Sequence, residues 1–209
     1  MLDALLAPRC AGCDAPGAWL CHDCRDLCDP VRRGRLHAAG TFGGPLRRAI
    51  HRFKYQGERA LANELGALVA GCVARDLARG VALDVVAPAV MHPERARLRG
   101  YDQAALLAAE VASRTALPLR AFLRRVRLAQ PQAQLDRAAR VANMRNAFVA
   151  EAASPTLASL AKPGPLPRGL RVALVDDVAT TGATLTAAAG ALRAAGAREV
   201  RFYVVAFDE

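Results

Sequence analysis

The sequence predicts an α/β protein in which a parallel sheet, covered by helices on both faces, follows a small cysteine-rich module. The last third of the chain reads as strand, helix and strand, the βαβ unit from which parallel sheets are built. Residues 84–88 form a short apolar run ending at a proline, which is typical of a buried parallel strand. Five of the six cysteines lie between Cys10 and Cys28. These features predict a module over residues 1–30 and an α/β domain over residues 31–209.

The cysteine-rich module has the spacing of a zinc site. Two Cys-x-x-Cys pairs, seven residues apart, supply four thiols: Cys10, Cys13, Cys21 and Cys24. Four thiolates complete the tetrahedral coordination of Zn²⁺, so we expect a structural metal site of the zinc-ribbon kind. In a reducing compartment, clustered cysteines are more typical of a metal site than of disulfides. Free thiols are the alternative, and Cys28 and His22 are further candidate ligands.

Helical and extended patterns alternate along the first half of the domain. A helix is predicted over residues 43–55, with a proline near its first turn, and a second over residues 58–77, where apolar residues recur at helical spacing. The strand at 84–88 is followed by a basic stretch to Gly100 that predicts a loop. Residues 102–113 then predict a helix that crosses over the sheet.

The second half of the domain is clearest at its end. Short strands are expected around residues 122–123 and 148–149, and a composition rich in proline, glycine and alanine predicts a connecting loop over residues 154–169. A polar turn joins the first strand of the final unit to its helix. The strand, helix and strand of that unit are predicted over residues 171–175, 183–195 and 199–207.

This polar turn has the composition of a sugar-phosphate site. Asp176 and Asp177 offer acceptors that suit the vicinal hydroxyls of a pentose. The following residues supply hydroxyl and backbone N–H donors at a helix start, where an anion is attracted: Ala179, Thr180, Thr181, Gly182, Ala183 and Thr184. Ligands of open α/β sheets bind where loops leave the carboxyl ends of strands. The alternative is a capped turn without a ligand, and the lack of Gly-Lys-Ser/Thr excludes a Walker loop.

Positive charge is concentrated in two segments of a chain whose net charge is +10. Residues 31–54 hold seven bases and no acid, and residues 95–148 hold eleven arginines and three acids. These segments predict polyanionic partners, either phosphate-bearing ligands or nucleic acid, unless they form only a solubilising surface. Lys54, Arg97 and Arg99 are candidate contacts for a pyrophosphate with Mg²⁺, or else plain solvated charges.

Neither a membrane span nor a secretion signal is recognisable in the sequence. No apolar run reaches the ~18 residues of a membrane span. The opening residues up to Arg9 carry an acid where a signal peptide needs a base, and their apolar core is short. We therefore expect a cytoplasmic protein.

The stretch from Val175 to Thr184 resembles the phosphoribosyl diphosphate (PRPP) motif of type I phosphoribosyltransferases. The order strand, Asp-Asp, two residues, Thr-Thr-Gly-Ala-Thr carries the resemblance. It implies the parallel-sheet fold of that family, with Asp176 and Asp177 as catalytic residues that hold the ribose 2′- and 3′-hydroxyls. It also implies that residues 179–184 enclose the 5′-phosphate.

Other short motifs resemble one subfamily, the ComF (competence protein F, GntX-like) group. After the paired cysteines come Phe53-Lys54-Tyr55-Gln56-Gly57, Arg99-Gly100-Tyr101-Asp102-Gln103-Ala104, and Arg125 followed by Gln130 or Gln134, Leu135, Arg140, Asn143 and Phe148. Each motif is weak alone, but their order around the PRPP motif is specific. Two residues depart from the pattern: Asp102 stands where Asn is common, and Ala129 stands where Thr is frequent.

Three functions are compatible with these residues. The resemblance implies a ComF-type protein that binds PRPP or a ribose 5-phosphate ligand and takes part in handling single-stranded DNA, with the DNA-uptake machinery as a partner. An active phosphoribosyltransferase using PRPP and Mg²⁺ is the second, although no residues that would select a base are recognisable. A zinc-ribbon nucleic-acid binder with an unused PRPP loop is the third.

Overall fold

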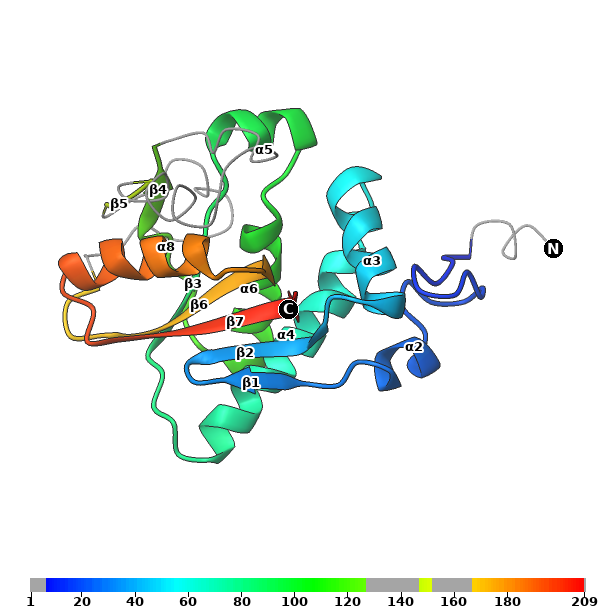
Figure 1. Ribbon diagram of the computed structural model, residues 1–209, viewed down its shortest axis with the longest axis horizontal. Coiled ribbons are helices and arrows are strands. Elements are labelled where there is room, and N and C mark those ends of the chain that lie inside the picture. Colours follow the sequence, from blue (N-terminus) through cyan, green and yellow to red (C-terminus); the bar gives the residue numbers. More distant parts are fainter. Residues whose placement is uncertain (1–6, 127–146, 152–166, 209) are drawn as a thin grey trace.

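A five-stranded sheet forms the centre of the computed structural model, which describes residues 7–126, 147–151 and 167–208 (Figure 1). From one edge to the other its strands are β1 (Val31–Arg33), β2 (Leu36–Thr41), β7 (Glu199–Phe207), β6 (Arg171–Ala179) and β3 (Val85–Pro88). All neighbouring strands run parallel except β1, which pairs antiparallel with β2. The predicted parallel sheet is confirmed.

Helices cover both faces of the sheet, as predicted. The three that pack on it are α4 (Leu61–Ala78), α6 (Gln103–Thr115) and α8 (Ala183–Ala194). Helices α4 and α6 lie on one face and α8 lies on the other (Figure 1). Successive residues of β6 point to opposite faces, so Ala173 and Val175 pack under α4 and α6, whereas Val172 and Leu174 pack under α8. Both faces of this strand are therefore core.

Helix α3 (Gly44–Tyr55) lies next to the carboxyl ends of the parallel strands and carries the cysteine-rich segment, with its short helix α2 (His22–Asp26), on its far side (Figure 1). The apolar face of α3 and the cysteine-rich segment belong to one hydrophobic cluster. The two approach so closely that a Cβ on Gly12 would lie 2.6 Å from Sγ of Cys24 and 2.8 Å from Cβ of Pro45. Only glycine fits at that contact.

One predicted loop is wrong, because the basic stretch after β3 forms the helix α5 (Pro93–Arg99). Nδ1 of His92 accepts a hydrogen bond from the backbone N–H of Glu94 at 3.3 Å and so caps the helix start. A proline occupies the first turn, and Gly100 ends the helix with a φ of 81°, a conformation that favours glycine. These capping residues outweigh the polar, arginine-rich composition that suggested a loop.

Strand β6 also continues four residues beyond its predicted end at Val175. Its backbone stays paired with β7 as far as Ala179, which lies opposite Phe207. Asp176 and Asp177 are therefore on the strand itself and not in a turn. The pairing fixes the direction of both acidic residues more firmly than a turn would.

Strands β4 (Leu123–Arg125) and β5 (Phe148–Ala150) form a separate antiparallel pair, which confirms the two short strands expected in the middle of the chain. The pair lies beside α8 (Figure 1). The predicted loop at 154–169 falls largely outside the described residues, as do the subfamily positions between 129 and 143.

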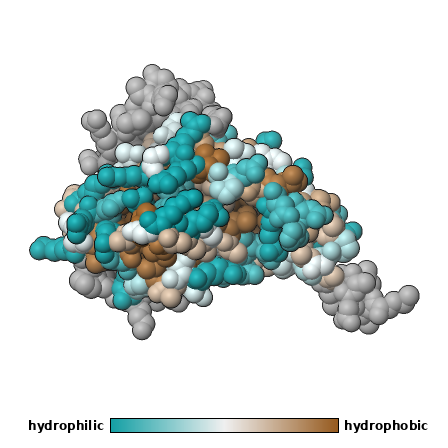
Figure 2. All heavy atoms as spheres, turned by 90° about the horizontal axis from the view of Figure 1, so that it is seen from below, coloured by the Kyte–Doolittle hydropathy of each residue, from teal (hydrophilic) through white to brown (hydrophobic). Residues whose placement is uncertain are grey.

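The surface seen in Figure 2 is mostly hydrophilic, with hydrophobic residues in separate patches. The large apolar side chains that are exposed in the described part of the chain are Leu27, Tyr55, Leu98 and Val149. Among the helices that the structure describes, none has the length and apolar character needed to span a membrane.

A buried polar network joins α4 to the sheet. The fully buried carboxylate of Asp76 accepts a hydrogen bond from the hydroxyl of Tyr203 at 2.8 Å. Nε2 of His37 lies 3.3 Å from the same oxygen, and Nη1 of Arg201 lies 3.9 Å from it. Burial lowers the pKa of His37 and, together with the contact to Asp76, raises the pKa of Tyr203. The Tyr203 hydroxyl is thus a principal donor to a charge that water cannot reach.

Tyr203→Phe is expected to lower the free energy of unfolding by about 1–3 kcal/mol, because it removes this donor from a buried carboxylate. Urea unfolding measures the difference. As a control, Tyr55→Phe removes the hydroxyl of a tyrosine that is 65% exposed and is expected to change stability by less than about 0.5 kcal/mol. Equal effects of the two substitutions would show that the network does not stabilise the fold.

Candidate functional site

The two carboxylates predicted to hold a pentose lie at the carboxyl end of β6, between β7 and β3. Asp177 forms an ion pair with Lys54 of α3, whose Nζ lies 2.8 Å from Oδ1, and the two side chains are 13% and 18% exposed. Oδ1 of Asp176 accepts a hydrogen bond from the backbone N–H of Asp177 at 2.8 Å. The structure therefore brings Lys54 onto the acidic pair from a distant part of the sequence.

Asp176 resists ionisation. Desolvation, followed by the negative charge of Asp177, raises the pKa of Asp176 to about 8, although Lys54 offsets part of this effect. The two acids of the pair consequently differ: Lys54 balances the charge of Asp177, whereas the raised pKa of Asp176 favours its protonated form. A ligand that donates hydrogen bonds or brings a cation would favour the ionised form of Asp176.

Two residues that were not predicted to belong to the site influence it. Asp102 is buried at the start of α6, where its carboxylate accepts hydrogen bonds from the backbone N–H groups of Ala105 (3.1 Å) and Met91 (2.7 Å). Its charge further raises the pKa of Asp176. Burial lowers the pKa of Arg125, at the end of β4, and the nearby charge of Asp176 partly restores it. The signals in the sequence were a helix-capping position for Asp102 and the subfamily pattern for Arg125.

The end of the site that would hold an anion is the start of α8. Gly182 has a φ of 69° and turns the chain from β6 into the helix. Oγ1 of Thr181 accepts a hydrogen bond from the N–H of Ala183 at 3.4 Å. Thr180 and Thr181 are exposed and Thr184 is half-buried. Hydroxyls and the N–H groups of a helix start thus follow the carboxylates directly, as the sequence predicts.

The other two predicted cations lie on α5. Arg99 donates from Nη1 to Oε1 of Gln103 at 2.9 Å, and its guanidinium lies 5.1 Å from the centre of the Tyr55 ring. Arg97 is exposed and forms no polar contact with another residue in the described ranges. Lys54 is therefore the predicted cation that contacts the acids, and contact of Arg97 or Arg99 with a pyrophosphate stays a prediction.

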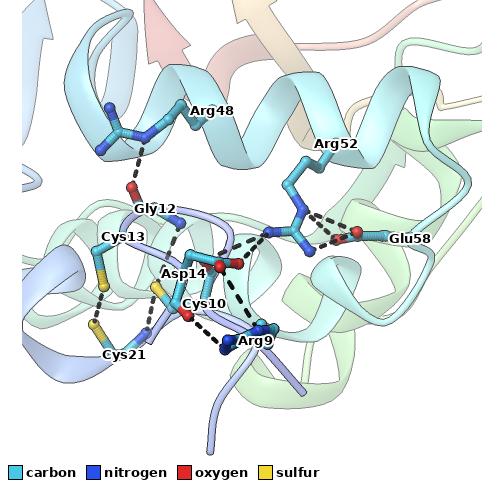
Figure 3. A network of polar contacts seen from close by, with 9 residues as sticks. All are labelled: Arg9, Cys10, Gly12, Cys13, Asp14, Cys21, Arg48, Arg52 and Glu58. Atoms are coloured by element: carbon cyan, nitrogen blue, oxygen red, sulfur yellow. Dashed lines mark hydrogen bonds and ion pairs between the residues drawn. The ribbon is translucent and has the colours of Figure 1, made fainter. Parts of the chain in front are cut away.

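The four predicted cysteine ligands lie together beside α3, where Figure 3 shows three of them. The sulfurs of Cys10, Cys13, Cys21 and Cys24 are all within 4.8 Å of one another. Tetrahedral thiolates on Zn²⁺ are about 3.8 Å apart, given Zn–S bonds of about 2.3 Å. The cluster therefore fits a zinc ion. The two further candidates have other contacts: His22 lies 2.8 Å from Asp26, and Cys28 donates to a backbone carbonyl at 3.4 Å.

Backbone N–H groups favour the metal-binding form of one cysteine. Those of Gly12 and Cys21 each lie 3.3 Å from Sγ of Cys10. Burial alone would raise the pKa of Cys10, but these backbone hydrogen bonds lower it to about 6. Because the thiolate is the form that binds a metal, the segment is prepared for an ion by its backbone as well as by its spacing.

Comparison with known proteins agrees with this geometry. Residues 102–209 match the family model of the phosphoribosyl transferase domain, the class of protein that the parallel sheet and the carboxylate pair define. Over 204 residues the chain is 30% identical to competence protein F of Haemophilus influenzae, an alignment that covers 95% of this chain and 84% of that protein. The chain therefore belongs to the competence protein F family of phosphoribosyltransferase-like proteins.

Two solved structures are also similar. One is described as the allosteric regulatory enzyme of purine biosynthesis, with 24% identity. The other is the glutamine phosphoribosylpyrophosphate amidotransferase from B. subtilis complexed with ADP and GMP, with 25% identity. Each alignment has a TM-score of 0.41 and covers 68% of this chain and 25% of the other, so the chain spans about a quarter of those proteins.

Cys13→Ser is expected to abolish zinc binding, because three thiolates leave the tetrahedron incomplete. Zinc released from purified protein and measured with a colorimetric chelator gives the metal content per chain. Cys28→Ser is the matched control, since Cys28 lies outside the cluster of four sulfurs, and it is expected to retain the wild-type content. Equal loss of zinc from both variants would mean that the four ligands are wrongly identified.

Asp176→Asn is expected to stabilise the chain at pH 8 and to leave it nearly unchanged at pH 4. The pKa of Asp176 is about 8 in the fold, against about 3.9 for an unfolded aspartate, so the folded chain retains a proton that the unfolded chain releases. The stability from that proton is full below pH ~4 and is lost as the pH rises through 8. Thermal unfolding should therefore show a higher melting temperature for the variant than for the wild type at pH 8, and little difference at pH 4.

Asp177→Asn serves as the comparison for that measurement, because it leaves Lys54 without its ion pair. It is expected to lower the melting temperature at pH 8. A gain of the same size in both variants would indicate general relief of negative charge and not a raised pKa at Asp176.

Proposed function

We propose that the chain binds PRPP or another ribose 5-phosphate ligand at the end of β6. Asp176 and Asp177 would accept hydrogen bonds from the ribose 2′- and 3′-hydroxyls, and residues 179–184 would surround the 5′-phosphate. One observation carries the proposal: the two carboxylates at the end of β6 are followed directly along the chain by the start of α8. A bare phosphate could use the helix start but not the carboxylates, whereas a phosphorylated pentose uses both.

Lys54 would have different partners in the empty and in the ligand-bound site. Without a ligand it neutralises Asp177 at 2.8 Å. When the ribose hydroxyls form hydrogen bonds with the carboxylates, the Lys54 ammonium becomes available to the diphosphate of PRPP. Arg99 and Arg97 could approach the same diphosphate from α5. Mg²⁺ would enter with the diphosphate, because this ion is usually held by phosphate oxygens, water and one or two carboxylates.

We further propose that this binding serves the handling of single-stranded DNA, the role that the family resemblance implies. The basic segment at 31–54, which includes β1, β2 and α3, would supply electrostatic contacts to the strand. The described part of the second basic segment adds α5 and β4. The DNA-uptake machinery would be the partner, and reduced cysteines that bind zinc suit the cytoplasm.

An active phosphoribosyltransferase is the second candidate, favoured by the half-buried Arg125, which lies close enough to Asp176 for their charges to interact. In that reaction the bond between C1′ and the diphosphate oxygen breaks and pyrophosphate leaves with the electron pair. A base nitrogen bonds to C1′, and the proton displaced from that nitrogen passes to solvent. A cation near the departing charge would stabilise the transition state. Release of pyrophosphate with one nucleobase, and not with the others, would support this reading.

The double variant Asp176→Asn/Asp177→Asn is expected to weaken binding of PRPP with Mg²⁺ by at least about 10-fold, because each hydrogen bond to a charged group contributes about 1.5–3 kcal/mol. Isothermal titration calorimetry measures the affinity. Arg99→Ala tests the diphosphate contact and should also weaken binding. Arg193→Ala, an exposed arginine at the far end of α8, is the control and should bind like the wild type. Wild-type affinity in the double variant would contradict the proposal.

A further inference from the structure

A cavity of about 630 Å³ lies between the cysteine-rich segment and α3, apart from the carboxylate site. One wall consists of residues 10–14 of the cysteine-rich segment. The other wall is one face of α3, formed by Arg47, Arg48, His51, Arg52 and Gln56. None of these residues of α3 is a proposed metal ligand or a proposed contact of the pentose.

Two of the three arginines in the wall have no acidic partner in the part of the chain that the structure describes. Arg52 is neutralised by Glu58, with Nε 2.9 Å from both carboxylate oxygens, and it approaches Asp14 at 4.0 Å (Figure 3). Arg48 instead donates from Nε to the carbonyl oxygen of Gly12 at 2.5 Å. Arg47 lies with its guanidinium 5.9 Å from the centre of the Phe42 ring. Within the described residues, no carboxylate is within ion-pair distance of Arg47 or Arg48.

Two aromatic rings lie further along the same face of α3. The ring of His51 lies 4.9 Å from that of Tyr55, and Tyr55 is 65% exposed. The guanidinium of Arg99 lies 5.1 Å from the centre of the Tyr55 ring, which adds a third cation. Tyr55 comes eight positions after Arg47, which corresponds to about 12 Å along the helix. The arginines therefore lie at one end of this face and the exposed ring of Tyr55 at the other.

This arrangement fits a single-stranded nucleic acid. Proteins bind such strands with cationic groups that follow the phosphates and with exposed aromatic rings on which bases stack. A free inorganic anion would use the arginines but not the ring, and the bases of a duplex are already stacked on one another. The helix also leads to Lys54, so a strand lying along it would reach the carboxylate site.

We propose that the cavity and the adjoining face of α3 bind single-stranded nucleic acid, with Arg47 and Arg48 holding phosphates and Tyr55 stacking a base. The proposal deepens the DNA-handling part of the proposed function and is independent of PRPP binding. Arg48 also ties the helix to Gly12, so Arg47 and Tyr55 are the residues to change without disturbing the packing.

The test uses the full, zinc-loaded chain and a fluorescein-labelled oligothymidylate, with fluorescence anisotropy recorded between 50 and 200 mM salt, which is about the range where phosphate contacts lose affinity steeply. Arg47→Ala should weaken binding and reduce the slope of log K against log salt by about 0.7, the value for one phosphate contact on a single strand. Tyr55→Ala should weaken binding about 5- to 100-fold, the usual range for a stacked base, and leave the slope unchanged.

Arg193→Ala is the matched control, because it removes one exposed arginine outside the cavity. Equal effects of Arg47→Ala and Arg193→Ala would overturn the proposal in favour of general charge attraction. Loss of zinc from Arg47→Ala would overturn it too, because the arginine would then serve the metal site. Titration with PRPP and Mg²⁺ separates the proposals. Wild-type protein that binds PRPP but no oligonucleotide refutes this inference together with the DNA-handling role and leaves the PRPP site standing. Oligonucleotide binding that neither Arg47→Ala nor Tyr55→Ala weakens refutes this inference alone.

Discussion

The arrangement of the site depends on the ion pair between Lys54 and Asp177. Two neighbouring carboxylates at the end of a buried strand repel each other and are poorly solvated, so one of them needs a cation and the other a proton. Lys54 supplies the cation at 2.8 Å, and the raised pKa of Asp176 favours a proton there. The position of Lys54 is in turn set by α3. The hydroxyl of Tyr101 donates a hydrogen bond to the carbonyl of Phe53, which fastens the end of the helix beside the start of α6.

Helix α3 is also fastened to the cysteine-rich segment, so one helix connects the candidate metal centre with the acidic pair. Arg48 contacts the carbonyl of Gly12 at 2.5 Å, and Arg52 contacts that of Cys10 at 3.5 Å (Figure 3). Both carbonyls belong to the loop that a zinc ion would hold rigid. The same helix therefore contacts both the loop of the candidate metal centre and, through Lys54, the acidic pair. The cysteine-rich segment thus supports α3 and shares its hydrophobic cluster.

Much of the fold could be predicted from the sequence, because its last third is strongly periodic and apolar. The cysteine cluster was equally accessible, since ligand spacing alone defines it. Strand β1 was missed because it is short and mostly arginine, and β2 was missed because alanine and glycine take the place of the β-branched residues typical of strands. Helix α5 was missed because its signals are capping residues such as His92 and not a periodic pattern. In the site, the acidic pair and the helix start were predicted from local order. That Lys54 contacts Asp177 depends on how α3 packs against the sheet, and no local pattern records such packing.

Asp102 shows how a departure from a family pattern can be read physically. Its two carboxylate oxygens accept hydrogen bonds from two different N–H groups, Oδ1 from Ala105 and Oδ2 from Met91. An asparagine has a single acceptor oxygen, so it could satisfy one of these donors and would turn its own NH₂ group towards the other. The backbone around Met91 therefore requires the aspartate here. The same carboxylate brings a third negative charge near Asp176 and helps to raise its pKa. A residue that holds the start of α6 thus also contributes, after burial and Asp177, to the raised pKa of Asp176.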